Sequence, residues 1–131
     1  MFKKLLTAFT FLFVANLMIA QSIGIIGSAT PNGWDSDTDM TQDMVNTDLW
    51  TINIDLVTGE AKFRQDDDWA VNWGAGDFPT GVGEQDGPNI PVPGGNYDVT
   101  FNTATGEYSF TYTGTSFASI GVIGDATPNG W

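Results

Sequence analysis

Side chains able to do covalent or redox chemistry are nearly missing from this sequence. It contains no Cys and no His, so it lacks thiol nucleophiles, imidazole bases, disulfides and the soft ligands of most transition metals. Sixteen Asp and Glu remain, and carboxylate pairs do hydrolyse glycosidic bonds. With so many acids some pair lies close by chance, and a small domain has little cleft. We therefore expect no enzyme, no catalytic residue and no cofactor.

The tryptophans are better suited to recognition than to catalysis. Trp34 ends a Gly-rich turn and opens a polar loop, where a large ring either covers the edge of the core or meets a ligand. Trp69 and Trp73 alternate with Val71 on one face of an expected strand 69–74. We expect Trp69 in the core and Trp73, next to Gly74 and a long loop, at the rim. Trp50, which alternates with isoleucines, is also expected in the core.

Lys62 and Arg64 are the only cations after residue 20. They flank Phe63, which we expect to face inward, so both should project from the same side of a sheet. They either neutralise Asp66–Asp68 as surface pairs worth about 0–1 kcal/mol, or donate hydrogen bonds to a ligand. An aromatic platform with fixed polar side chains around it is what a sugar needs, because its C–H face stacks and its hydroxyl rim forms hydrogen bonds.

A calcium site is a competing use of the acids. Asp35, Asp37 and Asp39 have the spacing of a calcium loop, but the EF-hand pattern requires Gly at its sixth position and Glu at its twelfth. Those positions hold Met40 and Asn46. We therefore expect no metal site of that kind, and an irregular calcium site stays open as an alternative.

The net charge of −12 makes negatively charged partners unfavourable. The four cationic residues are Lys3, Lys4, Lys62 and Arg64. Lys3 and Lys4 directly precede the N-terminal apolar run. Nucleic acid and anionic lipid are therefore not expected partners.

Residues 1–20 are typical of an export signal. Two Lys precede an apolar run that ends at Ala20, before Gln21. Met18 departs from the small residue preferred at that position, so an uncleaved anchor is the alternative, although the run is shorter than the roughly 18–20 residues of a membrane span. We expect cleavage, export and no transmembrane span in the mature protein.

A repeat defines the domain organisation. The segment 22–34, SIGIIGSATPNGW, recurs at 119–131 as SIGVIGDATPNGW, with eleven of thirteen positions identical. An offset of 97 residues indicates a tandem of whole domains, because solenoid repeats are shorter. We expect one domain over 21–114, a second, truncated copy beginning at 115–131, and a monomer.

Alternating apolar and polar residues predict an all-β domain. The expected strands are 22–27, 49–56, 60–65, 69–74, 88–92, 95–102 and 106–112, an immunoglobulin-like antiparallel β-sandwich of about seven strands. Thr-Gly-Glu triplets at 58–60 and 105–107 predict hairpins. Residues 30–48 and 75–87 are expected as long loops.

Three segments resemble a known family. IGIIGSATPNGWD, KFRQDDDWAVNWG and NIPVPGGNYDVTFNTATGEYSF occur in the order and at the spacing of the SusE/SusF family of Bacteroidetes starch-binding proteins, over nearly all of 22–112. The W-x-x-N-W-G element at 69–74 is also similar to domains appended to pullulanases. The resemblance implies tandem immunoglobulin-like domains on the outer cell surface that bind α-glucan through aromatic platforms without catalysis. The family's lipidated Cys is replaced by Gln21 and Ser22, so we expect no direct lipid anchor.

The sequence thus predicts a non-catalytic α-glucan-binding domain at the cell surface, outer membrane or outside the cell. The expected ligand-binding residues are Trp34 and Trp73 as stacking surfaces, with Lys62, Arg64 and Asn72 as hydrogen-bonding partners. The alternative is a structural or adhesive repeat without a glycan site, stabilised by calcium or not. The binding hypothesis requires a solvent-facing Trp ring within reach of Lys62 or Arg64.

Overall fold

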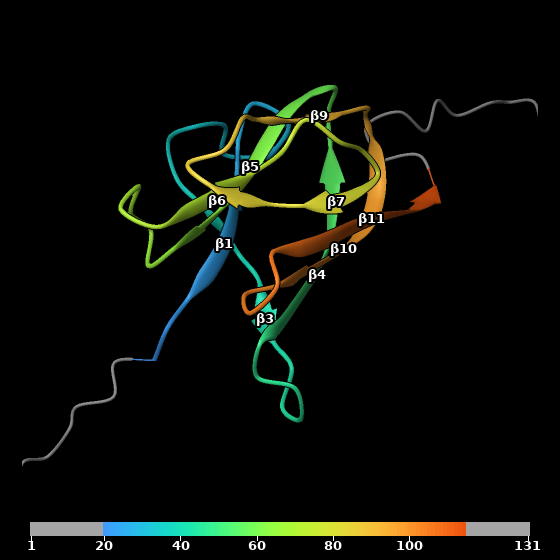
Figure 1. The fold of residues 1–131 in the computed structure, drawn as a ribbon. Coiled ribbons are helices and arrows are strands. Elements are labelled where there is room, and N and C mark those ends of the chain that lie inside the picture. Colours follow the sequence, from blue (N-terminus) through green and yellow to red (C-terminus); the bar gives the residue numbers. More distant parts are fainter. Residues whose placement is uncertain (1–19, 115–131) are drawn as a thin grey trace, which may run out of the picture.

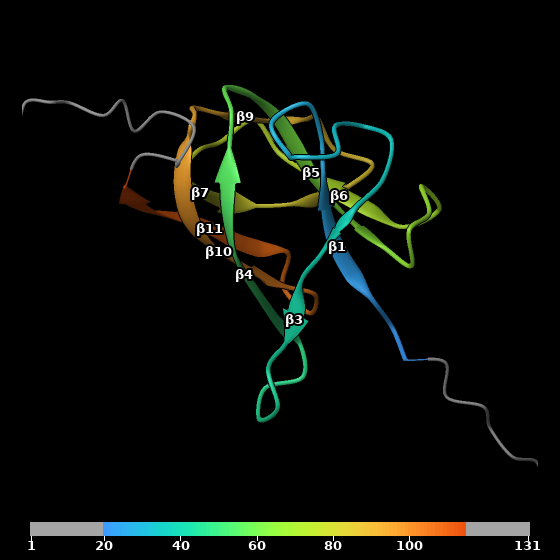
Figure 2. The same cartoon turned by 180° about the vertical axis from the view of Figure 1, so that it is seen from behind.

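Two antiparallel β-sheets face one another in the computed structural model, which describes residues 20–114 (Figures 1 and 2). No helix occurs among these residues, so none that could cross a membrane. The predicted all-β, immunoglobulin-like sandwich is confirmed. The predicted export signal, apart from Ala20, and the predicted second copy at 115–131 lie outside the described residues.

The first sheet has the strand order β2-β1-β5-β6-β8, and β9 pairs with the beginning of β5. Its strands are β1 (Ile23–Ile26), β2 (Thr38–Asp39), β5 (Gly59–Gln65), β6 (Asn72–Gly74), β8 (Glu84–Gln85) and β9 (Ile90–Val92). The second sheet has the order β3-β4-β10-β11-β7. Its strands are β3 (Thr41–Gln42), β4 (Leu49–Leu56), β7 (Thr80–Val82), β10 (Gly95–Asn102) and β11 (Glu107–Gly114).

All seven predicted strands are present, and four short strands are added to them. The additional strands β2, β3, β7 and β8 lie inside the two segments expected as loops. They have two or three residues each, too few for an alternating pattern to be read in the sequence. They pair with the edges of the sheets, so both long segments are held against the sandwich.

Aromatic side chains from both sheets form the core. Phe63 of β5 stacks on Phe101 of β10 with centroids 4.4 Å apart and planes 6° apart. Both rings are fully buried, and each such burial contributes about 1.5–3 kcal/mol. Tyr108 and Phe110 pack at tilted angles of 43° and 40° against Phe63 and edge-on against each other. Trp50 is buried as predicted.

Only one of the two predicted hairpins exists. Residues 103–106 connect β10 and β11, which pair along their length, and Gly106 of the predicted turn adopts a positive φ of 81° there. The hairpin predicted at 58–60 is wrong, because β4 and β5 belong to different sheets. The chain crosses between sheets at this point, and a Cβ on Gly59 would lie 2.7 Å from Ser28 Oγ. Gly59 is therefore required by a close approach and not by a tight turn.

Three loops cover the outer face of the first sheet. Glycines on this face leave room for them: a Cβ on Gly24 would lie 2.7 Å from Cβ of Asp37, and one on Gly74 would lie 2.0 Å from the carbonyl oxygen of Pro88. The loop after β1, the loop after β5 and the segment after β8 thus lie against the outer face of β1, β5 and β6. The side chains of Trp34, Trp69, Lys62 and Arg64 lie on this covered face.

Candidate functional site

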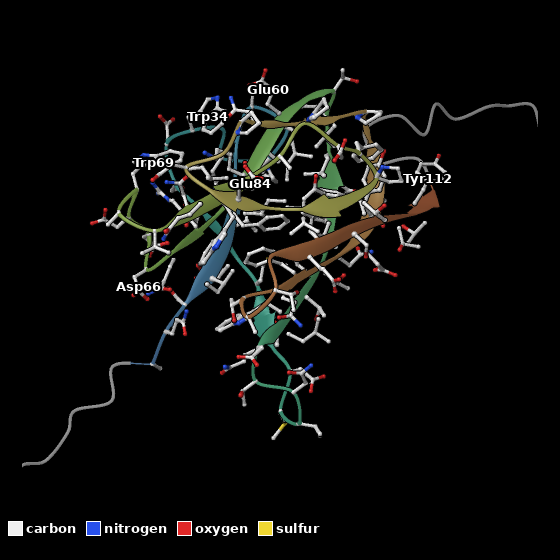
Figure 3. All side chains as sticks on the ribbon, in the orientation of Figure 1. Trp34, Glu60, Asp66, Trp69, Glu84 and Tyr112 are labelled. Atoms are coloured by element: carbon white, nitrogen blue, oxygen red, sulfur yellow. The ribbon has the colours of Figure 1, made fainter. Side chains whose placement is uncertain are left out.

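Trp34 and Trp69 form an exposed aromatic pair on this face. Their ring centroids are 5.9 Å apart and their planes are inclined by 37°. The two residues remain 40% and 45% exposed, and Figure 3 shows them at the same edge of the molecule. Trp34 comes from the loop after β1 and Trp69 from the loop after β5, so the pair joins two separate loops.

Local hydrogen bonds fix the loop that carries Trp34. Thr30 Oγ1 donates to the carbonyl oxygen of Gly27 at 2.9 Å, and Gly27 N donates to the carbonyl oxygen of Gly33 at 3.2 Å. Gly33 has a φ of 59°, which Gly adopts without steric cost. The repeated ATPNGW motif thus encodes a closed turn that presents Trp34.

Carboxylates shape the loop that carries Trp69. Asp66 and Asp67 both adopt a φ of 53°, a conformation that Asp tolerates better than most residues. Asp68 Oδ1 then accepts a hydrogen bond from Ala70 N at 2.8 Å. This turn ends β5 and delays β6 until Asn72, which leaves Trp69 outside the strand register.

Arg64 connects the two tryptophan loops from below. Its Cζ lies 4.8 Å from the centroid of the Trp69 ring, and its Nε donates to Oδ1 of Asp37. A cation over an aromatic ring contributes about 0.5–2 kcal/mol, more when the cation is desolvated, and Arg64 is buried. The guanidinium therefore joins the Trp69 loop to the loop that includes both Trp34 and Asp37.

Asp37 is an unusually buried acid. Its side chain is only 1% exposed, and Oδ2 has no hydrogen-bond partner within residues 20–114. Burial raises the pKa of Asp37 above its ordinary value; the hydrogen bond and charge of Arg64 oppose this rise, and the nearby Asp67 carboxylate adds to it. The carboxylate is thus held at an energetic cost between one cation and one like charge.

Lys62 lies on the same face, two residues from Arg64, and holds the third loop. Its Cε lies 3.0 Å from the point that a Cβ added to Gly74 would occupy. Its Nζ donates to the carbonyl oxygen of Gly87 at 2.6 Å. Burial lowers the pKa of Lys62, and the charge of Asp86 partly opposes this. The predicted common face of Lys62 and Arg64 is present, but both side chains are buried and neither pairs with Asp66–Asp68 as one hypothesis required.

Asn72 supports the Trp69 loop from β6. Its Nδ2 donates to the carbonyl oxygen of Trp69 and to Oδ1 of Asp86, both at 2.9 Å. The residue is buried, and its Oδ1 has no hydrogen-bond partner in the described part of the chain. Asn72 therefore supports the backbone of Trp69 from a buried position and does not lie at the surface.

The positions predicted for Trp69 and Trp73 are reversed in the structure. Trp73 is half-buried, packs against the core and has its centroid 5.0 Å from that of Phe101, whereas Trp69 is exposed. The prediction failed because it placed residue 69 in the same strand as residue 73. Three consecutive Asp residues before Trp69 were the available signal that a turn intervenes.

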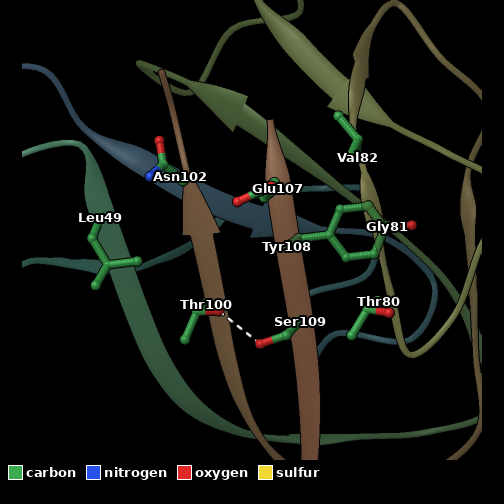
Figure 4. A pocket seen from close by; sticks show the side chains of 9 residues that line it. All are labelled: Leu49, Thr80, Gly81, Val82, Thr100, Asn102, Glu107, Tyr108 and Ser109. Atoms are coloured by element: carbon green, nitrogen blue, oxygen red, sulfur yellow. Dashed lines mark hydrogen bonds between the residues drawn. The ribbon is translucent and has the colours of Figure 1, made fainter. Parts of the chain in front are cut away.

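The other candidate sites differ from this one in chemistry. Within residues 20–114, no three acidic side chains gather closely enough to hold a metal ion. The outer face of the second sheet carries a shallow pocket of about 460 Å³, where Thr100 and Ser109 share a hydrogen bond of 2.7 Å (Figure 4). Its only aromatic ring, Tyr108, is buried, so this pocket lacks a stacking surface.

Comparisons with known proteins do not assign this site. The chain matches no protein-family model, and neither a curated protein nor a solved structure is significantly similar to it.

Proposed function

We propose that this domain binds α-glucan without catalysis, and that Trp34 and Trp69 form the sugar-stacking surface. The observation that carries the proposal is the exposed indole pair, which is contributed by two loops and centred 5.9 Å apart. Adjacent apolar side chains exposed to solvent are typical of interaction sites, and sugar rings bury their C–H faces on aromatic surfaces.

The arrangement beneath the pair supports this use of the tryptophans. Arg64 fixes Trp69 by its contact with the ring, and Asn72 fixes the backbone of the same residue. Lys62 holds the neighbouring loop. These three residues are therefore positioning residues in the proposal, and ordering the platform before binding reduces the entropy lost on complex formation.

Arg64 also has donors left for a ligand. Only its Nε forms a hydrogen bond within residues 20–114, and neither Nη atom is among the fully buried, unpartnered atoms. A hydroxyl at the edge of the Trp69 ring would meet these N–H groups. Charge-assisted hydrogen bonds of this kind are stronger than neutral ones.

The inclination of the rings favours a curved ligand. Two sugar units that stack on planes 37° apart must turn relative to each other, as successive units of an α-glucan do, whereas a flat β-linked chain suits coplanar rings. The resemblance of residues 22–112 to SusE/SusF starch-binding proteins points to the same polysaccharide. The expected export signal would place the domain at the cell surface or outside the cell, where such polymers are found.

The test is a titration of the full chain with maltoheptaose, soluble starch, xylan and laminarin, followed by tryptophan fluorescence and calorimetry. We expect saturable binding of the α-glucans only. Trp34→Ala and Trp69→Ala should each weaken it about tenfold, since losing one stacking contact of about 1.5 kcal/mol corresponds to that factor.

Tyr112 supplies the matched control. It is also an exposed aromatic residue, but it lies on the far side of the molecule from the tryptophan pair (Figure 3). Tyr112→Ala should bind like the unmodified chain. A folded chain that binds none of the four glycans would contradict the proposal and favour the structural repeat.

A further inference from the structure

The loop between β3 and β4, residues 43–48, projects from one end of the sandwich (Figures 1 and 2). Its tip carries Met44 and Val45, which are 96% and 95% exposed. The tip is rigidly built: Asp43 Oδ1 accepts from Val45 N at 2.8 Å and from Asn46 N at 2.7 Å. Two adjacent apolar side chains are thus held in solvent on an ordered loop, which we call the apolar finger.

An apolar pocket lies at the opposite end. It has a volume of about 370 Å³ and is lined by Thr58, Gly59, Phe78, Pro91, Val92 and Pro93. β4 runs from the finger at Leu49 to the neighbourhood of the pocket at Leu56. At about 3.3 Å per residue the two features are separated by about 23 Å, too far for one domain to fill its own pocket.

Strand β1 begins beside the segment that leads into the finger, and β11 ends near the pocket. The carbonyl oxygen of Ile23, the first residue of β1, accepts from Met40 N at 2.8 Å, close to the base of the finger. Gly114, the last residue of β11, pairs with Asn96 beside Gly95, and Gly94 N donates to Thr58 Oγ1 in the pocket wall at 3.1 Å.

The repeat places the start of a second copy within reach of this pocket. Ser119 corresponds to Ser22 in the repeated segment, so five residue steps separate Gly114 from the start of the next copy. Such a connection spans at most about 18 Å. In a head-to-tail tandem, the finger end of one copy therefore faces the pocket end of the preceding copy.

Charge also favours an apolar contact between copies. The described domain is rich in acids, and its two cations, Lys62 and Arg64, are buried, so a second copy of the same composition would be acidic as well. Ion pairs between copies are therefore hardly available, whereas an apolar side chain entering an apolar pocket contributes about 25 cal/mol per Å² buried.

From these features we propose that consecutive copies of this domain dock head to tail, with the Met44–Val45 finger of one copy inserted into the Phe78–Pro91–Val92 pocket of the copy before it. The contact is heterologous, since the two surfaces differ, and such contacts extend into open arrays. Tandem linkage raises the effective concentration of finger and pocket, so a weak contact suffices to order neighbouring domains.

The absence of Cys from the sequence gives a direct test with single thiols. Val45→Cys leaves Met44 in the finger, and Pro91→Cys places a thiol on an exposed position of the pocket wall. Full chains carrying one change each are mixed and treated with a short thiol-to-thiol cross-linker. We expect this pair to couple about tenfold faster than Val45→Cys with Thr111→Cys, a gain equivalent to about 1.4 kcal/mol.

Thr111 is the matched control because it is exposed and lies on β11, away from the pocket lining. Adding Met44→Asp to the Val45→Cys chain should reduce coupling to the control rate, with circular dichroism verifying the fold. Equal rates for the two original pairs would overturn the proposal. Selective coupling of Pro91→Cys to Phe117→Cys within one chain would also overturn it, by assigning the pocket to the chain's own connecting segment.

Discussion

Arg64 is the residue on which the proposed platform depends most. It contacts the Trp69 ring and hydrogen-bonds Asp37, and both members of the ion pair are buried. The energetic value of a buried pair lies mainly in the cost of breaking it, because the remaining charge stays desolvated.

Removing the cation should therefore destabilise the fold strongly. Arg64→Met keeps much of the stem volume but strands the Asp37 carboxylate, so we expect a loss of about 3–5 kcal/mol in the free energy of unfolding. Urea denaturation followed by circular dichroism measures it. The double variant Arg64→Met with Asp37→Leu should recover most of this loss, and a double variant as unstable as the single one would contradict the account.

The raised pKa of Asp37 gives a dependence on pH whose sign is determined. Burial makes the folded state hold this proton more tightly than the unfolded state. Its contribution to stability is therefore full below the ordinary value of 3.8 and is lost as the pH rises through the folded pKa. Because Asp37→Asn removes this titration, the stability of the variant relative to the unmodified chain should increase from pH 3 to pH 7.

Urea unfolding of the Asp37→Asn variant and of the unmodified chain at pH 3, 5 and 7 measures the difference between their free energies of unfolding. The titration of the other carboxylates is common to both proteins and cancels in this difference. A difference that stays constant, or that decreases toward pH 7, would show that Arg64 outweighs the burial of Asp37.

At the scale of the elements, alternation predicted every strand long enough to show it. β4, β10 and β11 have eight residues each, and their inward positions carry large apolar side chains. The four short edge strands and the crossover at Gly59 were missed, because they depend on contacts between segments distant in sequence. The residues next to these positions in the sequence do not indicate which distant segment they contact.

The candidate site was predictable only in part for the same reason. The polar loop around Trp34 left open whether the ring covers the core edge or meets a ligand, and the ring is exposed; Phe63 between two cations correctly indicated their common face. Trp69 was missed because a turn built by Asp66–Asp68 shifts it out of register. The partner of Arg64, Asp37, lies 27 residues away in the sequence, and no spacing rule predicts that pairing.

Two nearby glycines, one at the end of β6 and one in the loop that follows it, provide a matched test of how tightly the loops cover the first sheet. A Cβ on Gly74 would lie 2.0 Å from the carbonyl oxygen of Pro88, whereas one on Gly76 would meet nothing within 4 Å. Gly74→Ala must displace backbone and should cost about 1–3 kcal/mol. Gly76→Ala should be neutral or stabilise slightly by restricting the unfolded chain.

Thermal unfolding of the two variants provides the measurement. Equal melting temperatures would mean that the segment after β8 moves away at little cost, and would contradict the account that Lys62 holds this segment against the sheet.

At the scale of the whole molecule, charge is the dominant feature. The acids outnumber the cations sixteen to four, and both cations of the described domain are buried. Like charges on a compact surface repel and destabilise it, and at 0.1 M salt the repulsion is largely screened between charges more than about 10 Å apart. The buried contact of Arg64 with Asp37 is screened much less.

Salt should therefore stabilise the domain, and the kind of salt separates two explanations. We expect the melting temperature to rise by a few degrees, equivalent to about 1 kcal/mol, between low ionic strength and 0.2 M NaCl. If screening is the whole cause, CaCl₂ at matched ionic strength should give a similar rise, since residues 20–114 contain no cluster of three acids placed to hold a metal. A much larger rise with CaCl₂ than with MgCl₂ at matched ionic strength would instead indicate a specific calcium site and favour the calcium-stabilised structural repeat. A fall in melting temperature with NaCl would show that the attraction between Arg64 and Asp37 outweighs the repulsion among the surface acids.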